Sequence, residues 1–421
     1  MDNQKNKFEV LDIKSFNKKM LNWLQQFNIF CFTNNCGYSS PLGFKTLIAC
    51  GVETSIELSN DGGFEKIQSY LESMPGWVFG HFNYEAGRKD PNNFDDNVGF
   101  PEGYFFSPKY LIQIYDNTVE FLKCPDSPSD VLFEIENFTE LPNVQKKSLN
   151  IKSKINKQDY LSSLLKIKEH IQFGDCYEIN FCQEFFASGD ISPAQLYLQL
   201  SELAPNPFSA FYKIEDKFCL CQSPERFIKK SGKQIISQPI KGTIARGMNK
   251  DEDLKNYSEL KNSEKNKSEN VMIVDLVRND FSKVCNAGSV KVDELFAIKS
   301  YPGVHQMVST IKGELKDNIS FSEIMEATFP MGSMTGAPKS KVMELINQYE
   351  RSKRGLYSGS IGYIEPNGDF DFNVVIRSLF YNSTNKYISF QAGGGITINS
   401  DAENEYEESL LKTKIIRKVL K

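Results

Sequence analysis

The chain has 421 residues, of which 40% are hydrophobic and 24% charged, and its formal net charge is -5 at pH 7. This composition supports a sizeable core in two or three average domains or in one large α/β body, and it excludes the basic balance of a nucleic-acid-binding protein. No apolar run reaches membrane-spanning length and residues 1–7 are polar, unlike a signal peptide, so we expect a cytoplasmic protein without a membrane partner.

The first part of the chain predicts strand-rich structure. Clusters of Asn, Asp, Gly and Pro at residues 60–63 and 90–93 predict turns between the strands. Residues 146–157 are polar and basic and mark a boundary between two regions of the chain. We therefore divide the chain into residues 1–150, an N-terminal region that is part of the same body, and residues 151–421.

The second region begins with a helix and a strand. An apolar stripe predicts a helix over residues 158–173, which Gly174 and Asp175 end, and a strand follows over residues 176–186. Polar residues fill positions 249–270, the most soluble part of this region. Residues 271–277 are the next helix candidate.

The C-terminal elements alternate between helix and strand patterns. Pro338 stands where a helix over residues 339–350 would start. Three strands are expected over residues 359–364, 370–379 and 387–392, and a final helix over residues 401–420.

The nine cysteines are scattered, and the chain has only three histidines. A zinc site or a Cys-His or Ser-His-Asp catalytic group therefore lacks suitable residues. Cys219 and Cys221 lie in a strand-like stretch, where they would share one face. We expect reduced cysteines that mostly pack in the core.

Lys241 is the strongest single candidate for chemistry. It follows a strand-like stretch and stands between Pro239, which fixes one φ angle, and Gly242, which removes a neighbouring side chain. A desolvated lysine can lose its proton near neutral pH and act as an amine nucleophile. Taken alone, the segment fits a solvated lysine in a Pro/Gly turn better than a nucleophile.

Three other patterns allow two interpretations each. Glu405, Glu408 and Lys412 fall on one helix face, as surface pairs often do. Residues 331–340 bring glycines to a helix start, which can bind an anion, although the spacing does not fit a Walker motif. The glycines at 393–395 permit a close backbone approach to a ligand or form a bulged turn.

Six segments in order resemble the chorismate-utilising enzymes, strongly over residues 150–421 and weakly before them. They are Ser223–Phe227, Pro239–Thr243, Glu269–Asp280, Thr335–Lys339, Gly393–Ile396 and Glu405–Lys412. The resemblance implies an α+β fold of two large, mostly antiparallel β-sheets packed as a sandwich with helices outside. It also implies that residues 151–421 form the chorismate-binding catalytic region and residues 1–150 an N-terminal region of the anthranilate synthase component I type.

Two positions indicate a branch of this family. Anthranilate synthases typically carry alanine at the place of Lys241, whereas aminodeoxychorismate synthases carry lysine. The enzymes that add water to chorismate use a lysine base at the position of Glu178. The resemblance is therefore to the branch that aminates chorismate at C4, toward 4-aminobenzoate and folate.

The family's residue roles carry over to matching positions of this chain. Glu225 matches the general acid, Lys241 the nucleophile that adds at C2, and Glu269 with Glu408 the Mg²⁺ ligands. The residues that match substrate contacts are Gly242, Thr243, Ile244, Tyr357, Arg377, Gly393, Gly394, Gly395 and Lys412.

One position departs from the family pattern. The family usually has a histidine where this chain has Gln306, and His305 lies one residue earlier. In a strand a shift of one residue reverses the face, so we expect no substitution of one for the other. Relatives also bind tryptophan near the segment that matches residues 207–209.

The sequence contains no visible glutaminase, so we expect ammonia from a separate glutamine amidotransferase subunit. Two alternatives stay open: anthranilate synthase component I, with Lys241 a local variation, and a non-catalytic subunit that binds chorismate or an amino acid. Retention of Glu225, Lys241 and both Mg²⁺ carboxylates argues against the second.

Overall fold

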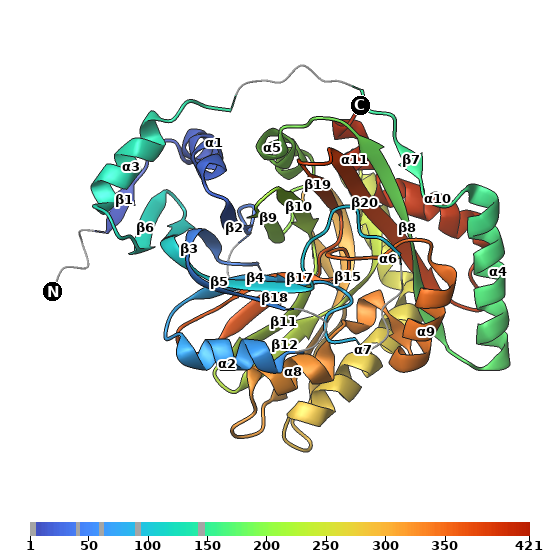
Figure 1. The fold of residues 1–421 in the computed structure, drawn as a ribbon. Helices are drawn as coiled ribbons and strands as arrows, with labels where there is room; N and C mark the ends of the chain where they lie inside the picture. Colours follow the sequence, from blue (N-terminus) through green and yellow to red (C-terminus); the bar gives the residue numbers. More distant parts are fainter. Residues whose placement is uncertain (1–5, 39–42, 59–62, 89–93, 142–147) are drawn as a thin grey trace.

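Antiparallel strands form the centre of the protein (Figure 1). The computed structural model describes residues 6–38, 43–58, 63–88, 94–141 and 148–421, and within them every strand pairing is antiparallel. The turns expected at residues 60–63 and 90–93 fall largely outside these ranges. The expected α+β class with large antiparallel sheets is confirmed.

The first layer of strands combines the N-terminal and C-terminal parts of the chain. Its order is β1 (Lys7–Glu9), β6 (Thr118–Lys123), β5 (Gly103–Tyr115), β3 (Thr46–Leu58), β2 (Ile29–Asn34), β9 (Phe208–Ile214), β10 (Lys217–Ser223), β19 (Ser378–Asn382), β20 (Tyr387–Ile396) and β8 (Glu178–Ser188). Two short strands, β7 (Lys152–Ser153) and β16 (Gly336–Ala337), also pair with β8.

The second layer continues from the long strand β5, which pairs with both β3 and β4. Its order is β4 (Val78–Phe82), β17 (Ser360–Ile364), β18 (Phe370–Asn373), β11 (Arg226–Ser231), β12 (Gln234–Gln238) and β15 (Val304–Glu314). The strands β13 (Ile240–Ala245) and β14 (Lys291–Ser300) also pair with β15. The two layers are therefore parts of one continuous hydrogen-bonded network.

The main core lies between the two layers, and alternation along each strand decides which side chains enter it. Cys219 and Cys221 of β10 join this core, whereas Leu220 joins a second apolar cluster on the outer face. The shared face expected for the two cysteines is confirmed. All nine cysteines are free and most are buried, which agrees with the expected packing role.

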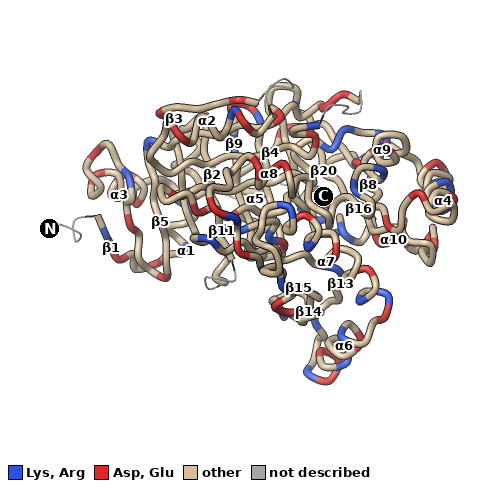
Figure 2. Tube along the Cα trace, turned by 90° about the horizontal axis from the view of Figure 1, so that it is seen from below, with Lys and Arg blue, Asp and Glu red and all other residues tan. Residues whose placement is uncertain are grey.

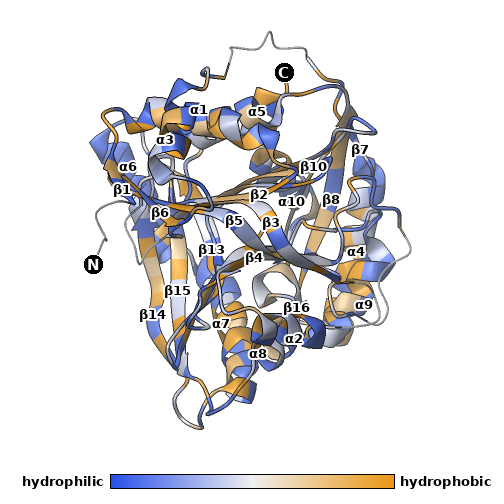
Figure 3. Cartoon of the chain, turned by 60° about the vertical axis from the view of Figure 1, so that its left-hand side comes forward, coloured by the Kyte–Doolittle hydropathy of each residue, from blue (hydrophilic) through white to orange (hydrophobic). Residues whose placement is uncertain are grey.

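Helices cover the outer faces, as Figure 3 shows. The outer cluster of the first layer is covered by α1 (Ile13–Trp23), α3 (Pro128–Asn137), α5 (Pro193–Leu203) and α11 (Lys414–Val419), with the short 3₁₀ turn η1 (Leu24–Gln26) after α1. The main core is closed by α2 (Glu65–Ser73), α7 (Glu264–Val284) and α8 (Phe321–Thr328). A third cluster packs α4 (Lys157–Phe173), α9 (Lys339–Tyr349) and α10 (Ala402–Lys412) against β8 and β20.

Two expected elements differ from the structure. The strand expected over residues 370–379 is divided into β18 and β19, because Arg377 adopts a left-handed φ of 52° that interrupts the extended chain. The helix expected over residues 401–420 is divided at Thr413 into α10 and α11, where the Thr413 hydroxyl and N–H both bond to the Leu410 carbonyl.

The polar segment at residues 249–270 is helical. It contains α6 (Lys250–Asn262) and the first turns of α7, and α6 carries both signs of charge beside β13, β14 and β15 (Figure 2). High polarity concealed this helix because only Leu260 on α6 is fully buried. Among the described residues no helix is long and apolar enough to cross a membrane.

Candidate active site

Lys241 lies at the start of β13, where the backbone bulges against β15. Gly242 has a φ of 89°, and a Cβ there would lie 2.8 Å from Asn266 Cγ on α7, so this position favours glycine. Lys241 is only 8% exposed, and its Nζ bonds to Oε1 of Glu178 on β8, which is 1% exposed. The first layer thus supplies the buried carboxylate that meets the lysine of the second layer.

Burial alone would favour loss of the Lys241 proton, but the neighbouring carboxylates act against it. Burial by itself lowers the pKa of Lys241, but the charges of Glu178, Glu269 and Glu225 outweigh it and raise the pKa above the ordinary lysine value. The surrounding carboxylates therefore favour the ammonium form of Lys241. A further proton transfer is needed before it can act as a nucleophile.

Glu225 follows β10 and is 3% exposed. Burial raises the pKa of its carboxyl to about 7, although the hydroxyl of Ser333 and the charges of Lys241 and Arg377 act in the opposite direction. Its backbone is fixed as well, since its N–H bonds to Ser223 Oγ and its carbonyl accepts from Val374. A carboxyl in this state can donate a proton near neutral pH.

A group of carboxylates converges from α7 and α10. A Cβ at Gly394 would lie 2.9 Å from Glu405 Oε2 and 3.9 Å from Glu408 Oε1. The ammonium group of Lys265 lies 3.2 Å from Glu405 and 3.9 Å from Glu269, so it bridges the two helices. Burial raises the pKa of Glu269, and its Oε1 has no hydrogen-bond partner among the described residues.

These carboxylates fit a divalent cation that keeps water or substrate oxygens as further ligands. Glu269 offers a buried oxygen without a hydrogen bond, and a lysine cation already lies between Glu269 and Glu405. The described residues alone hold no cluster of three His, Cys, Asp or Glu side chains close enough for a metal ion. Magnesium, which usually retains several waters, matches such an incomplete protein shell.

Glu408 and Lys412 are partners of one another in this structure. Lys412 Nζ lies 2.8 Å from Glu408 Oε1 and also donates to the Gly393 carbonyl at 2.8 Å. The nearby lysine lowers the pKa of Glu408. The family resemblance pointed to Glu408 and Lys412 but not to Glu405, which is 3% exposed and whose carboxylate lies beside Gly394.

The glycines of β20 allow a close approach, but to side chains of this chain. A Cβ at Gly395 would lie 2.5 Å from Glu178 Oε1 and 2.8 Å from Lys241 Nζ, so no other residue fits there without moving that pair. Gly393 pairs with Cys182 of β8, whose sulfur lies 3.6 Å from the Tyr357 hydroxyl. Tyr357 is therefore held beside the glycine segment.

Arg377 stands between β18 and β19 and is linked to the same site through charge. Burial lowers the pKa of its guanidinium, and the charge of Glu225 acts in the opposite direction. Thr243 and Ile244 continue β13 and pair with Gln306 and His305 of β15.

His305 is engaged away from the lysine. Its ring nitrogens contact Ser300 Oγ at 2.8 Å and Asp253 Oδ1 at 3.1 Å, and its ring packs on Tyr257 of α6. Gln306 is fully buried, and neither of its amide atoms has a hydrogen-bond partner among the described residues. The histidine therefore does not take the place of the family's residue, as expected from its face of the strand.

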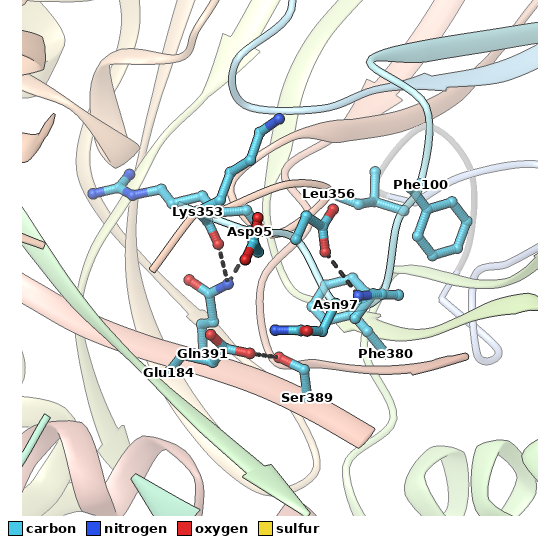
Figure 4. A pocket seen from close by; sticks show the side chains of 12 residues that line it. Asp95, Asn97, Phe100, Glu184, Lys353, Leu356, Phe380, Ser389 and Gln391 are labelled. Atoms are coloured by element: carbon cyan, nitrogen blue, oxygen red, sulfur yellow. Dashed lines mark hydrogen bonds between the residues drawn. The ribbon is translucent and has the colours of Figure 1, made fainter. Parts of the chain in front are cut away.

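Another polar pocket lies elsewhere along β8 and β20, as Figure 4 shows. Asp95, Asp96 and Glu184 are its acidic residues, and Glu184 accepts hydrogen bonds from the hydroxyls of Ser389 and Tyr387, both at 2.8 Å. Burial raises the pKa of Glu184. A separate cavity of about 210 Å³ borders Phe208, Ile240 and Tyr301.

Comparison with known proteins agrees with this architecture. The chorismate binding enzyme family matches residues 48–418, and the chain belongs to that family. It is 37% identical to aminodeoxychorismate synthase component 1 of Escherichia coli, over 84% of this chain and 79% of that protein. The component 1 protein of Bacillus subtilis is 35% identical, over 82% of this chain and 77% of that protein.

A solved structure shows the same fold at lower sequence identity. Anthranilate synthase component I from Streptococcus pneumoniae aligns with a TM-score of 0.79 and 24% identity, covering 90% of this chain and 93% of that one. At this level of identity the match confirms the fold and leaves the reaction to be argued from the site.

Proposed function

We propose that this chain is an aminodeoxychorismate synthase component I, which aminates chorismate at C4 with ammonia to give 4-amino-4-deoxychorismate. The observation that carries the proposal is the position of Lys241, which is buried between the two layers. Its Nζ bonds to the carboxylate of Glu178, and its charge interacts with Glu225. Membership of the chorismate binding enzyme family and similarity to two component 1 proteins support it.

The C4 hydroxyl of chorismate is a poor leaving group and needs a proton. Glu225, whose pKa is about 7, would donate that proton while Lys241 adds at C2. Ammonia then adds at C4 and the lysine leaves, so the enolpyruvyl group is retained. A separate lyase would later remove pyruvate to give 4-aminobenzoate.

The remaining site residues would position the substrate. Arg377 suits a planar carboxylate because its guanidinium can bond through two N–H groups, and Lys412, Tyr357 and the 393–395 backbone lie around the same segment. Gly242, Thr243 and Ile244 would lie beneath the ring.

Glu269 and Glu408, together with Glu405, would hold Mg²⁺, which when bound supplies positive charge for the ring carboxylate. The proposal includes a separate glutamine amidotransferase subunit as the ammonia source and a cytoplasmic location. It also retains the division into an N-terminal region, residues 1–150, and a catalytic region, residues 151–421.

The test is product identity. Purified protein with chorismate, Mg²⁺ and ammonium is expected to make 4-amino-4-deoxychorismate, which chromatography separates from anthranilate. Anthranilate and pyruvate as main products would instead establish the anthranilate synthase alternative, and no consumption of chorismate would favour a non-catalytic subunit.

A further inference from the structure

The ion pair of Lys241 and Glu178 is closed off from solvent. Their side chains are 9% and 1% exposed, and Oε2 of Glu178 has no hydrogen-bond partner among the described residues. A buried carboxylate with one unsatisfied oxygen costs free energy, and native proteins retain few such groups. Gly395 leaves the space that both groups occupy.

The nucleophile must be neutral when it attacks, yet four carboxylates act on it. Glu178 of β8, Glu269 of α7, Glu225 after β10 and Glu408 of α10 all interact with its charge. These groups favour the ammonium form of Lys241. The reaction therefore needs a base in contact with Nζ that accepts a proton during the attack.

The other nearby groups are unsuited to this role. Glu225 holds the proton that the leaving hydroxyl needs, and Glu269 belongs to the cation site. His305 is bonded to Ser300 and Asp253, and Gln306 does not titrate. Glu178 is the carboxylate in direct contact with the lysine nitrogen.

We propose that Glu178 is a catalytic residue of this chain: it accepts a proton from Lys241 as the lysine attacks and returns it when the lysine leaves. The inference rests on the proposed function. In the first step the nitrogen bonds to C2, the two ring double bonds shift, and the C4–O bond breaks, with Glu225 protonating the departing oxygen to give water. In the second step ammonia bonds to C4, the N–C2 bond breaks, and Glu178 returns its proton to the lysine.

The experiment measures the rate at which chorismate forms a covalent adduct on Lys241 with Mg²⁺ but without ammonia, by quenching and mass spectrometry. Glu178→Gln keeps the shape but cannot accept the proton, so we expect adduct formation at pH 7 to slow on the order of 10²-fold. Glu184→Gln is the matched control on the same strand, and it should react at the wild-type rate.

A purely electrostatic role of Glu178 predicts the opposite change in the rate of adduct formation. If Glu178 served only to hold Lys241 charged, Glu178→Gln would lower the lysine pKa, free the amine and leave the adduct rate equal or higher, which would overturn the proposal. Glu178→Asp provides a second test, because it retains a carboxylate. It should keep more of the rate than Glu178→Gln, and equal loss in both variants contradicts proton transfer.

The covalent route through Lys241 and the proton transfer to Glu178 can be refuted separately. Absence of any adduct on Lys241 in wild type refutes the covalent route and the Glu178 role together. A wild-type adduct that Glu178→Gln forms equally fast refutes the Glu178 role alone and leaves the proposed function intact.

Discussion

Glu178 and Glu184 are both buried on β8, but their surroundings differ. Hydroxyls of Tyr387 and Ser389 bond to Glu184, whereas Glu178 contacts a lysine from the other layer and keeps one oxygen without a partner. The first arrangement directs two hydroxyl donors to one oxygen of a carboxylate. The second leaves capacity for proton transfer, and atoms without a hydrogen-bond partner also occur at Glu269 and Gln306.

Removal of the metal should cause the largest loss of activity of the changes considered. We expect chelation of Mg²⁺, or Glu269→Gln, to abolish turnover while the fold stays intact, because the ring carboxylate would lose the cation that offsets the negative charge of Glu269 and Glu408. Ammonium-dependent turnover and circular dichroism check both parts. Near-normal activity after chelation contradicts the metal assignment.

Lys241→Ala should cause the second-largest loss of activity. It deletes the proposed nucleophile but leaves Glu225 and the cation site, so we expect a loss on the order of 10²-fold or more with chorismate binding retained. Steady-state kinetics with ammonium and equilibrium binding separate the two. Full activity in this variant makes Lys241 a structural or binding lysine.

Glu225 predicts the sign of a pH effect. Its protonated form is the active one and its pKa is about 7, so kcat should fall as the pH rises above about 7. Glu225→Gln should reduce kcat on the order of 10²-fold and remove this dependence. A falling limb that persists unchanged in the variant assigns the titration to another group.

The smallest effect on activity is expected for a change of Glu184. Glu184→Gln retains an oxygen that accepts from Ser389 and Tyr387, so stability should change by about 1 kcal/mol or less and activity should stay near wild type. Thermal unfolding and kinetics measure both. A loss of activity as large as that of Glu178→Gln would remove the distinction between the two positions.

The sequence predicted much of this fold and part of this site. Helices at residues 158–173 and 339–350 and the strands at residues 359–364 and 387–392 were predictable from local periodicity. Lys241 and Glu225 became candidates through ordered motifs that match the family. Periodicity did not reveal α6, whose stability comes from packing of few residues on β13 and β15.

Long-range contacts explain what the sequence could not predict. Glu178 lies on β8 of the first layer and Lys241 on β13 of the second, so their contact forms only when the two layers pack together. The register of β13 against β15 is irregular at this point, between Ile240 and Thr243. Lys265 and Glu405 come together from α7 and α10, far apart in the chain. Such pairs depend on the register of the sheets, which local patterns do not determine.

The covalent route through Lys241 is tested by mass spectrometry of the wild-type protein after reaction with chorismate and Mg²⁺ in the absence of ammonia. We predict a covalent adduct on the peptide that contains Lys241, which disappears when ammonium is added and is absent from Lys241→Ala. An unmodified Lys241 in wild-type protein that still aminates chorismate at full rate would contradict the account.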